Sequence, residues 1–284
     1  MHYMPTEPRA LQMEGNMVGR RRWLIAALGL VLLGSLLLLD VSSLHLPDRA
    51  TWGVLGRVLG AALSPALTDE AQPLWQTVGL AAWQTIVFAV VAVSLACPLG
   101  LLLACWQRAI QLDPSCGRLA NVLGRACRLL IALTSIGTRS IHELFWAVIL
   151  LSMMGLTPMT AVLAIAIPYA GIFTKVFGEI LAETSSSQAK ALRRAGAGTS
   201  AAILLGDVAA ARPMLIAYMM VRFECGLRSA AVLGFFGLTT LGYHIHQTFI
   251  NADYHAMWTY LYALIALVVV SEYVCDWVRR ALRA

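Results

Sequence analysis

Apolar residues occur along the chain in long runs that are separated by short polar segments. A helix that crosses the hydrocarbon core of a membrane needs about 20 mostly apolar residues. We expect six runs that approach or exceed this length to be transmembrane helices: residues 23–39, 77–106, 140–156, 159–181, 208–230 and 256–278. The pattern predicts an all-α, polytopic membrane protein with about six transmembrane helices.

The first run follows three consecutive arginines at positions 20–22. A signal peptide is the alternative, but the run is long for a signal-peptide core and no small-x-small cleavage site follows it. We therefore interpret residues 1–22 as a cytoplasmic N-terminal segment and residues 23–39 as an uncleaved first transmembrane helix. Residues 40–76, which contain four acids, two arginines and three prolines, are expected to form a periplasmic loop.

The segment 119–138 decides the number of crossings. Arg118, Arg125 and Arg128 recur there on one face of a helix, and only residues 129–138 are free of charge. This uncharged part is about half of what a crossing helix needs. We therefore expect an amphipathic helix at the membrane interface.

The positions of the basic residues support six crossings. With six spans, most Lys and Arg residues of the connecting segments fall on the side of the two termini, and the opposite side holds only Arg49 and Arg57. A seventh span at 119–138 would move the basic cluster at 190–194 outside, against the preference of Lys and Arg for cytoplasmic loops. We expect a multi-pass protein of a bacterial inner membrane with both termini in the cytoplasm.

Composition narrows the function classes. The chain of 284 residues is 59% hydrophobic and only 13% charged, whereas soluble domains carry about 25% charged residues. The net charge of +6 lies mostly in short loops beside apolar runs, which favours the lipid bilayer over nucleic acid as a partner. The length leaves no room for a nucleotide-binding domain, and the chain has no Gly-x-x-x-x-Gly-Lys-Ser/Thr loop. ATP chemistry is therefore expected in another subunit.

The polar segment 183–213 is the most informative one. Residues 185–187 are serines that can cap a helix, residues 189–195 favour a helix, and Gly196 and Gly198 interrupt it. The pattern predicts a short helix, a glycine turn and a second helix on the cytoplasmic side. An ordinary cytoplasmic loop is the alternative that composition leaves open.

This segment resembles the coupling loop of permeases from binding-protein-dependent ABC importers. The family pattern is Glu-Ala-Ala, three residues, Gly, then a hydrophobe and a proline. Its matches here are Ala191, Gly196, Ile203 and Pro213. Other segments are similar to phosphonate-type (PhnE-like) permeases, and the resemblance covers about residues 75–284: 139–156, 171–180, 218–237 and 275–283.

The resemblance implies an architecture, partners and a function. It implies the type I (MetI-like) importer fold, with residues 77–284 as the permease core and 184–206 as the cytoplasmic coupling loop. A second permease subunit, identical or related, would complete the pathway. Two ATPase subunits would bind ATP and Mg, and a periplasmic binding protein would deliver substrate. The implied function is ATP-driven import of phosphonate or a related phosphorus oxyanion (phosphite, hypophosphite), with no cofactor in this chain.

The chain departs from the family pattern at several positions. Lys190 stands where Glu is usual, and Ala209 stands where a proline is common. His142 replaces a proline that usually kinks the third span, and Thr239 and Thr240 replace glycines near the expected external gate. The residues expected to couple to the ATPase are Lys190, Ala191, Arg193, Arg194, Gly196 and Ile203.

Charged residues also occur within or beside the expected spans. A charge at the bilayer centre costs at least about 2.5 kcal/mol, so such groups face a cavity or one another. Three acid–base pairs are four residues apart and can meet on one helix face: Arg139 with Glu143, Lys175 with Glu179, and Glu224 with Arg228. These pairs either stabilise helix ends or line a route for an anion, and the sequence leaves both open.

Arg222 has no partner at such a spacing. Its guanidinium suits a tetrahedral oxyanion, which accepts paired hydrogen bonds, although it could also bond carbonyls across a subunit interface. Ser229 is expected on the same helix face, and Thr239 and Thr240 at an outer constriction. The expected substrate-pathway residues are Arg139, Glu143, Arg222, Glu224, Arg228, Ser229, Thr239 and Thr240.

The other candidates for special chemistry are interpreted as structural. His244 and His246 would share a face on a strand, but the sequence places no third metal ligand beside them. The six cysteines show no Cys-x-x-Cys spacing, so neither a metal site nor a disulfide is expected. An aromatic belt accounts for four tryptophans near span ends: Trp23, Trp75, Trp258 and Trp277.

Other function classes fit less well. An intramembrane enzyme needs clustered His, Asp or Glu at one membrane face, and the acids within the spans all have basic neighbours at helical spacing. A secondary transporter that acts alone usually shows an internal repeat, and none is evident here. An ABC importer permease for a different small solute stays open, because the binding protein does much of the selecting.

Overall fold

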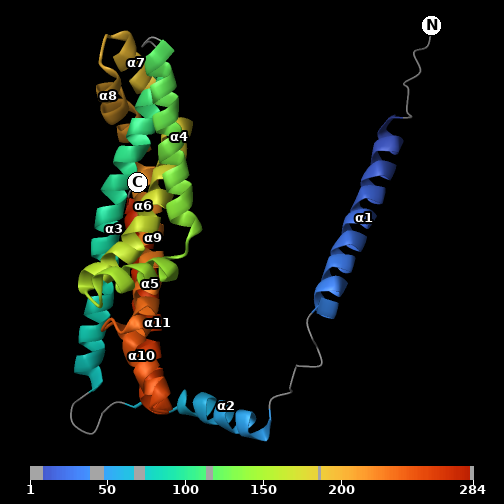
Figure 1. Ribbon diagram of the computed structural model, residues 1–284, viewed down its shortest axis with the longest axis vertical. Helices are drawn as coiled ribbons and strands as arrows, with labels where there is room; N and C mark the ends of the chain where they lie inside the picture. Colours follow the sequence, from blue (N-terminus) through green and yellow to red (C-terminus); the bar gives the residue numbers. More distant parts are fainter. Residues whose placement is uncertain (1–8, 39–47, 67–73, 113–117, 185–186, 282–284) are drawn as a thin grey trace. The chain divides into compact units, whose positions relative to one another are not determined.

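The computed structural model describes residues 9–38, 48–66, 74–112, 118–184 and 187–281, with the backbone alone for 9–20 and 118–120 (Figure 1). Every regular element among these residues is a helix, which confirms the predicted all-α fold. Cys116 and the serines predicted to cap a helix at 185 and 186 lie outside the described residues. The chain forms two units, Met1–Arg57 and Val58–Ala284, and each is considered by itself.

The first unit contains the predicted first transmembrane helix. Helix α1 runs from Arg9 to Leu38, and its part Arg21–Leu38 is long and apolar enough to cross a membrane. Its leucines are exposed, as expected for a helix that faces lipid. Helix α2, Arg49–Ala61, lies within the segment that was expected to be a loop.

The second unit is a bundle of long helices. Four of its segments are long and apolar enough to cross a membrane: α3 (Leu74–Leu112), α6 (Pro158–Glu183), the continuous helical segment Thr199–Phe236, and α11 (Tyr254–Ala281). Together with α1 they make five candidate spans among the described residues.

Small residues allow α3 to pack closely against α6. Ala89, Ala92, Ala96 and Ala104 of α3 are fully or almost fully buried, in the same core as Phe173 of α6. Lipid is as apolar as these side chains, so helix association in a membrane depends on close packing of this kind.

The third crossing differs from the prediction. Residues 140–156 were expected to be one span, but the helix there, α5 (Glu143–Met154), has 12 residues and is about 18 Å long, too short to cross. The chain instead uses two helices, α4 (Arg118–Ser140) and α5. The last turn of α3 lies beside the helix that follows α6, because Arg193 Nη1 donates to the Leu112 carbonyl at 2.8 Å. α4 runs along the bundle from this end, whereas α5 lies across it (Figure 1).

The helix predicted at 119–138 is present as α4 and is not among the candidate spans, but it packs along the bundle instead of lying apart from it. α4 runs alongside α3 and α6 (Figure 1), and Ser135 donates a hydrogen bond to the Gly171 carbonyl of α6 at 2.6 Å. The arginines that argued for an interface are accommodated because Arg125, Arg128 and Arg139 line hollows beside α3 and α6.

The end of the bundle where α3 begins also contains α10 (Leu241–Ile250) and the start of α11. Leu74, Leu241 and Tyr260 form part of a small second core there. The chain before α3 is tied to this end, since the Trp258 indole donates to the Val58 carbonyl at 2.6 Å.

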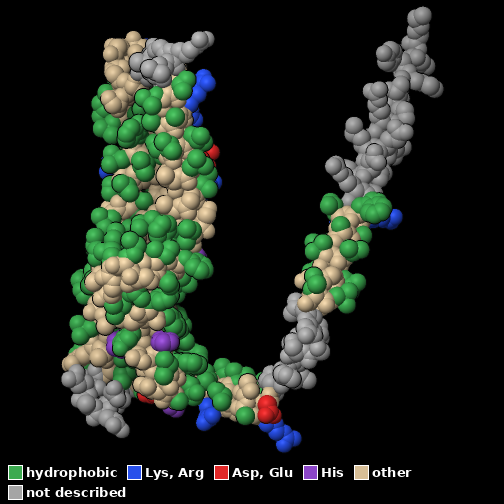
Figure 2. All heavy atoms as spheres, viewed as in Figure 1, with side chains coloured by type: hydrophobic (Ala, Val, Ile, Leu, Met, Phe, Trp, Pro, Cys, Tyr) green, Lys and Arg blue, Asp and Glu red, His purple; other side chains and the backbone are tan. Residues whose placement is uncertain are grey.

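The outer surface of the bundle suits lipid. Hydrophobic side chains are spread over the whole length of the bundle in Figure 2, and charged side chains are few on this face. Trp75 at the start of α3 and Trp277 near the end of α11 are both exposed. Their positions agree with the predicted aromatic belt.

Candidate functional site

The segment predicted to couple to an ATPase folds as a helix, a glycine turn and a second helix. α7 covers Ser187–Arg194 and α8 covers Thr199–Ala202. Gly196 has φ +88°, and the amides of Gly196 and Ala197 donate to the carbonyls of Arg193 and Leu192 at 3.1 and 2.9 Å. This is a Schellman C-cap with glycine in the left-handed position, which confirms the predicted turn.

A π-helix, η2 (Ile203–Val208), joins α8 to α9 (Ala209–Leu233) without a break. Ile203, the family hydrophobe, is 2% exposed and anchors this junction. Gly206 lies against α7 so closely that a Cβ atom there would come within 2.6 Å of the Ala189 Cα. We call Ser187–Val208 the coupling element, because it covers most of the predicted coupling loop and α7 packs on η2, which leads directly into α9.

Two contacts that the sequence did not predict fix the coupling element to α3. Arg193 Nη1 bonds the Leu112 carbonyl, as described above. Arg108 Nε lies 3.4 Å from Asp207 Oδ2, and the Asp207 side chain is 1% exposed. The sequence offered one indication that Asp207 has a special role, since it is the only acid between Glu183 and Glu224.

The outer face of the coupling element is basic. Lys190, Arg193 and Arg194 are exposed, as is Ala191. The structure thus brings together all six residues predicted for this site. Five of them are exposed, including Gly196 at the turn, and Ile203 is buried.

A second candidate site is an open cleft between α4, α6 and α9. Its volume is about 490 Å³, and it is lined by Arg139, Ser140, Ile172, Lys175, Val176, Tyr218 and Arg222. The volume lies within the roughly 300–1,000 Å³ of small-molecule sites. Lys175 also pairs with Glu179 at 3.7 Å, as predicted, whereas no ion pair joins Arg139 or Arg222 to a described residue. We call this the Arg222 cleft.

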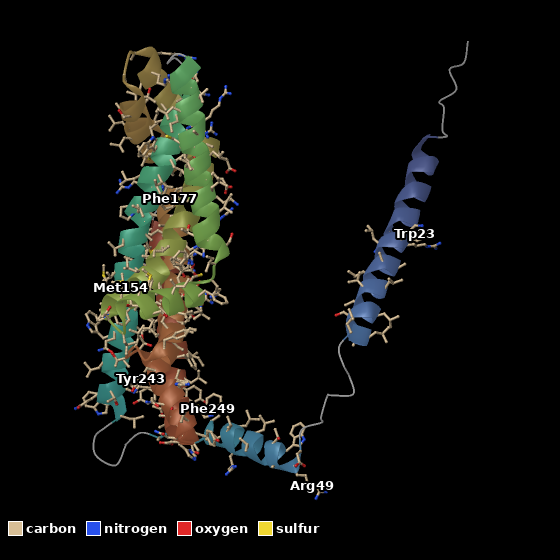
Figure 3. The ribbon with its side chains drawn as sticks, in the orientation of Figure 1. Trp23, Arg49, Met154, Phe177, Tyr243 and Phe249 are labelled. Carbon is tan, nitrogen blue, oxygen red and sulfur yellow. The ribbon has the colours of Figure 1, made fainter. Side chains whose placement is uncertain are left out.

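Aromatic side chains hold Arg222 in place. Its Nε donates to the Tyr218 hydroxyl at 2.9 Å. Its guanidinium carbon lies 5.4 Å from the centre of the Tyr218 ring and 5.8 Å from that of Tyr169, within the range of cation–π attraction. The Tyr218 ring in turn makes edge-type contacts with the rings of Phe173 and Phe177, with centroids 5.9 and 6.2 Å apart. Phe177, labelled in Figure 3, lies within the bundle.

Glu143 and Ser229 form a polar chain behind the cleft instead of lining it. Ser229 is 7% exposed and donates to Glu143 Oε1 at 2.7 Å. Its hydroxyl also lies 3.3 Å from that of Tyr169. Ser229 was predicted to face the anion with Arg222, and this prediction is wrong because Glu143 and Tyr169 occupy its hydroxyl.

The predicted pair of Arg139 with Glu143 on one helix face is also wrong. α4 ends at Ser140, and α5 begins at Glu143, so the two residues lie on different helices. His142 caps α5, with Nδ1 accepting from the Leu144 amide at 3.4 Å. The family's proline kink is thus replaced here by a full break with a histidine cap.

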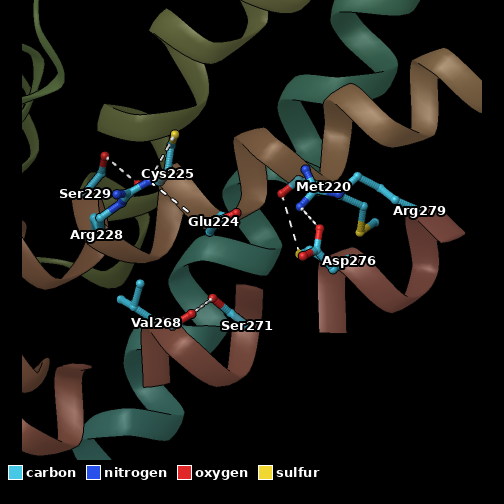
Figure 4. A network of polar contacts seen from close by, with 10 residues as sticks. Met220, Glu224, Cys225, Arg228, Ser229, Val268, Ser271, Asp276 and Arg279 are labelled. Carbon is cyan, nitrogen blue, oxygen red and sulfur yellow. Dashed lines mark hydrogen bonds and ion pairs between the residues drawn. The ribbon is translucent and has the colours of Figure 1, made fainter. Parts of the chain in front are cut away.

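Glu224 and Arg228 form their predicted pair, at 3.9 Å, but not in the cleft. Figure 4 shows this pair within α9 beside α11, where Arg279 Nη2 meets Asp276 Oδ1 of the same helix at 2.6 Å. The Cys275 thiol of α11 joins the two helices, since it lies 3.7 Å from the Met220 carbonyl of α9. These contacts support the structural interpretation of the pair.

Thr239 and Thr240 do not share one role. Thr240 is 0% exposed and precedes α10, with its hydroxyl 3.4 Å from the Ala231 carbonyl. A fully buried side chain cannot line an open constriction in this chain, so that prediction is wrong for Thr240. Thr239 is exposed.

His244 and His246 lie on helix α10, not on a strand, so they do not share a face. The His244 ring stacks on Tyr260 with centroids 4.9 Å apart, and the His246 ring packs against Phe235 at 5.1 Å. Both rings therefore have packing roles.

Comparison with known proteins agrees with this geometry. The family model of the binding-protein-dependent transport system inner membrane component matches residues 115–284. The phosphate-import permease protein PhnE of Mycolicibacterium smegmatis is 25% identical over 229 residues, 79% of this chain and 40% of that protein. A phosphite transport system permease protein of Stutzerimonas stutzeri, HtxE, is 29% identical over 47% of this chain and 51% of its own length.

A further relative is the cryptic phosphonate transport system permease protein PhnE2 of Escherichia coli. It is 27% identical over 43% of this chain and 96% of its own length. The chain spans about half or less of the first two relatives.

Among solved structures, the MetNI methionine ABC transporter has a chain with a TM-score of 0.61 and 20% identity. The match covers 76% of this chain and 99% of that one, and it supports the MetI-type fold. The helical bundle, the coupling element and the family match over most of the bundle lead to one conclusion. The chain belongs to the binding-protein-dependent transport system inner membrane component family.

Proposed function

We propose that this chain is the permease subunit of an ATP-driven importer for phosphonate or a related phosphorus oxyanion, such as phosphite or hypophosphite. In this proposal two permease subunits enclose the pathway, two ATPase subunits bind ATP and Mg, and a periplasmic binding protein delivers the substrate. The family supports the importer class, and the names of the relatives support this group of substrates.

The observation that carries the substrate class is the Arg222 cleft. Arg139, Lys175 and Arg222 line it, and no carboxylate does. A tetrahedral oxyanion matches the paired donors of a guanidinium, which a neutral solute does not. Because Tyr218 and Tyr169 hold Arg222 in place, little conformational entropy is lost when an anion binds.

The coupling element supports the ATP-driven mechanism. Its exposed Lys190, Arg193 and Arg194 suit an acidic groove on an ATPase subunit. The segment Thr199–Phe236 is helical throughout, so a displacement of α8 reaches Arg222 through one continuous helix. ATP-driven closure of the ATPase pair would then alter the Arg222 cleft.

Uptake by cells tests the proposal. A bacterial strain without its own phosphonate and phosphite uptake should accumulate radiolabelled methylphosphonate or phosphite when it expresses this chain with its ATPase and binding protein. Depletion of ATP should abolish the uptake. Accumulation of an unrelated solute, with none of either phosphorus compound, would contradict the proposed substrate class.

A further inference from the structure

A second hollow lies between α3, α4 and α6, on the side of the Arg222 cleft that is nearer to the coupling element. Its volume is about 370 Å³. Its polar lining comes from all three helices: Gln107, Arg108, Gln111, Ser135, Arg139, Thr174, Lys175 and Glu179. The prediction of substrate-pathway residues contained only Arg139 from this set.

The lining favours a small anion. Three cations, Arg108, Arg139 and Lys175, line it together with one carboxylate, Glu179. Lys175 pairs with Glu179 at 3.7 Å and Arg108 with Asp207 at 3.4 Å, so Arg139 is the lining cation that no ion pair joins to a described residue. Gln107 and Gln111 add neutral amide donors, which can bond an oxyanion without adding charge.

The hollow shares two lining residues with the Arg222 cleft and is tied to the coupling element. Arg139 and Lys175 line both spaces. At the other side of the hollow, Arg108 is held by its pair with the buried Asp207 of η2. An anion that leaves Arg222 thus meets the shared cations first and Arg108 next.

We propose that this hollow is a second oxyanion site, in which Arg108 and Arg139 bind the anion between the Arg222 cleft and the coupling element. The inference rests on the proposed function, because both sites are proposed to bind the same class of anion. Arg108 bonds Asp207, so occupancy of the hollow is felt by the coupling element.

The test is equilibrium binding of radiolabelled methylphosphonate to the complex of this chain with its ATPase subunits in nanodiscs, without nucleotide. Ala132→Phe fills the hollow and leaves its charged groups in place, because Ala132 lines the hollow but not the Arg222 cleft. Ala126→Phe is the matched control on an exposed position of the same helix, away from both spaces. Arg222→Gln removes the cleft site alone.

The wild type and Ala126→Phe should bind two equivalents per chain. Ala132→Phe and Arg222→Gln should each bind one, and the double variant none. A single equivalent in the wild type that is lost in Arg222→Gln and kept in Ala132→Phe would overturn the second site and leave the proposed function standing. Absence of any bound methylphosphonate in the wild type would overturn both.

Discussion

At the residue scale, the function proposed for this chain depends on how one guanidinium is held. Arg222 contacts Tyr218 through a hydrogen bond and Tyr169 through its ring, and Tyr169 in turn meets Ser229, which bonds Glu143. The chain of contacts connects α9 to α6 and α5. The position of the cation is therefore determined by three helices.

Arg222→Lys should lower methylphosphonate uptake roughly tenfold or more, because the charge stays but the paired donors are lost, and a hydrogen bond to a charged group contributes about 1.5–3 kcal/mol. Uptake should be measured beside the dimer fraction on native gels. Arg228→Lys is the matched control, since Arg228 lies on the same helix but outside the cleft.

Loss of the dimer in Arg222→Lys would instead assign Arg222 to a bridge between subunits. An intact dimer with wild-type uptake would contradict both roles. Normal assembly with weakened uptake is the result expected for an anion site.

Ser229→Ala should destabilise the protein by about 1 kcal/mol, because Glu143 loses its donor while it stays partly solvated. Thermal unfolding of the detergent-solubilised protein measures this effect. Ser152→Ala is the control, since its hydroxyl is exposed and bonds only the Val148 carbonyl within its own helix. Equal stability of the two variants would show that the Ser229–Glu143 bond contributes nothing.

At the element scale, the coupling element differs from a simple loop in having its own anchors. Gly206 allows α7 to lie on η2, and Arg108 with Asp207 fixes η2 to α3. π-Helical turns are costly and frequently mark functional positions. Force applied to α7 is therefore transmitted to both α9 and α3.

Gly196→Ala should reduce uptake strongly, whereas Gly198→Ala should be tolerated. A Cβ atom would meet nothing within 4 Å at either position, so the two substitutions differ only in the backbone conformation that the new residue must adopt. Gly196 has φ +88°, where an L-residue costs about 1–2 kcal/mol; Gly198 has φ −63°, which any residue adopts. Uptake and the amount of inserted protein should be measured together. Equal uptake in the two variants would remove the turn from the coupling mechanism.

The packing of α10 on α11 should depend on pH. Burial against Tyr260 lowers the pKa of His244 from its ordinary value of 6.5, because desolvation disfavours the imidazolium. Below pH 6.5 the unfolded chain therefore binds more protons at His244 than the folded chain does. The stabilisation from the buried neutral imidazole is present above pH 6.5 and is lost as the pH falls through the folded-state pKa.

Thermal stability should therefore be lower at about pH 5 than at about pH 7.5, and His244→Phe should reduce the difference. The aromatic replacement keeps a ring against Tyr260. The same pH dependence in the variant and the wild type would assign the effect to other groups.

At the scale of the whole molecule, the basic coupling element and the start of α10 lie at opposite ends of the bundle. α3 begins beside Leu241 and Tyr260 and ends beside Arg193. From the preference of Lys and Arg for cytoplasmic segments, we predict that the basic end faces the cytoplasm.

Cysteine labelling tests this orientation with two exposed positions, Gln188 on α7 and Asn251 after α10. A membrane-impermeant maleimide should label Asn251→Cys in spheroplasts, and Gln188→Cys only in inverted vesicles. The wild type, with its six cysteines, sets the background. Labelling of Gln188→Cys from outside would contradict the predicted orientation.

The sequence by itself determined the features that depend on local pattern. Long apolar runs predicted six transmembrane helices, and five of these correspond to described helical segments that are long and apolar enough to cross a membrane, because a bilayer sets a minimum length that few soluble helices reach. The glycine turn after α7 and the pairs Lys175–Glu179 and Glu224–Arg228 were predictable because each depends on residues within one turn or one helix.

Only the tertiary structure decided which charges share a space. The arginines of α4 argued locally against a helix that runs along the bundle, yet hollows beside α3 and α6 accommodate them. Arg108 and Asp207 are 99 residues apart, and no helical periodicity relates them. Ser229 was expected to face an anion, but it bonds Glu143 for the same physical reason. A buried hydroxyl bonds the nearest strong acceptor, and the packing between helices determines which acceptor that is.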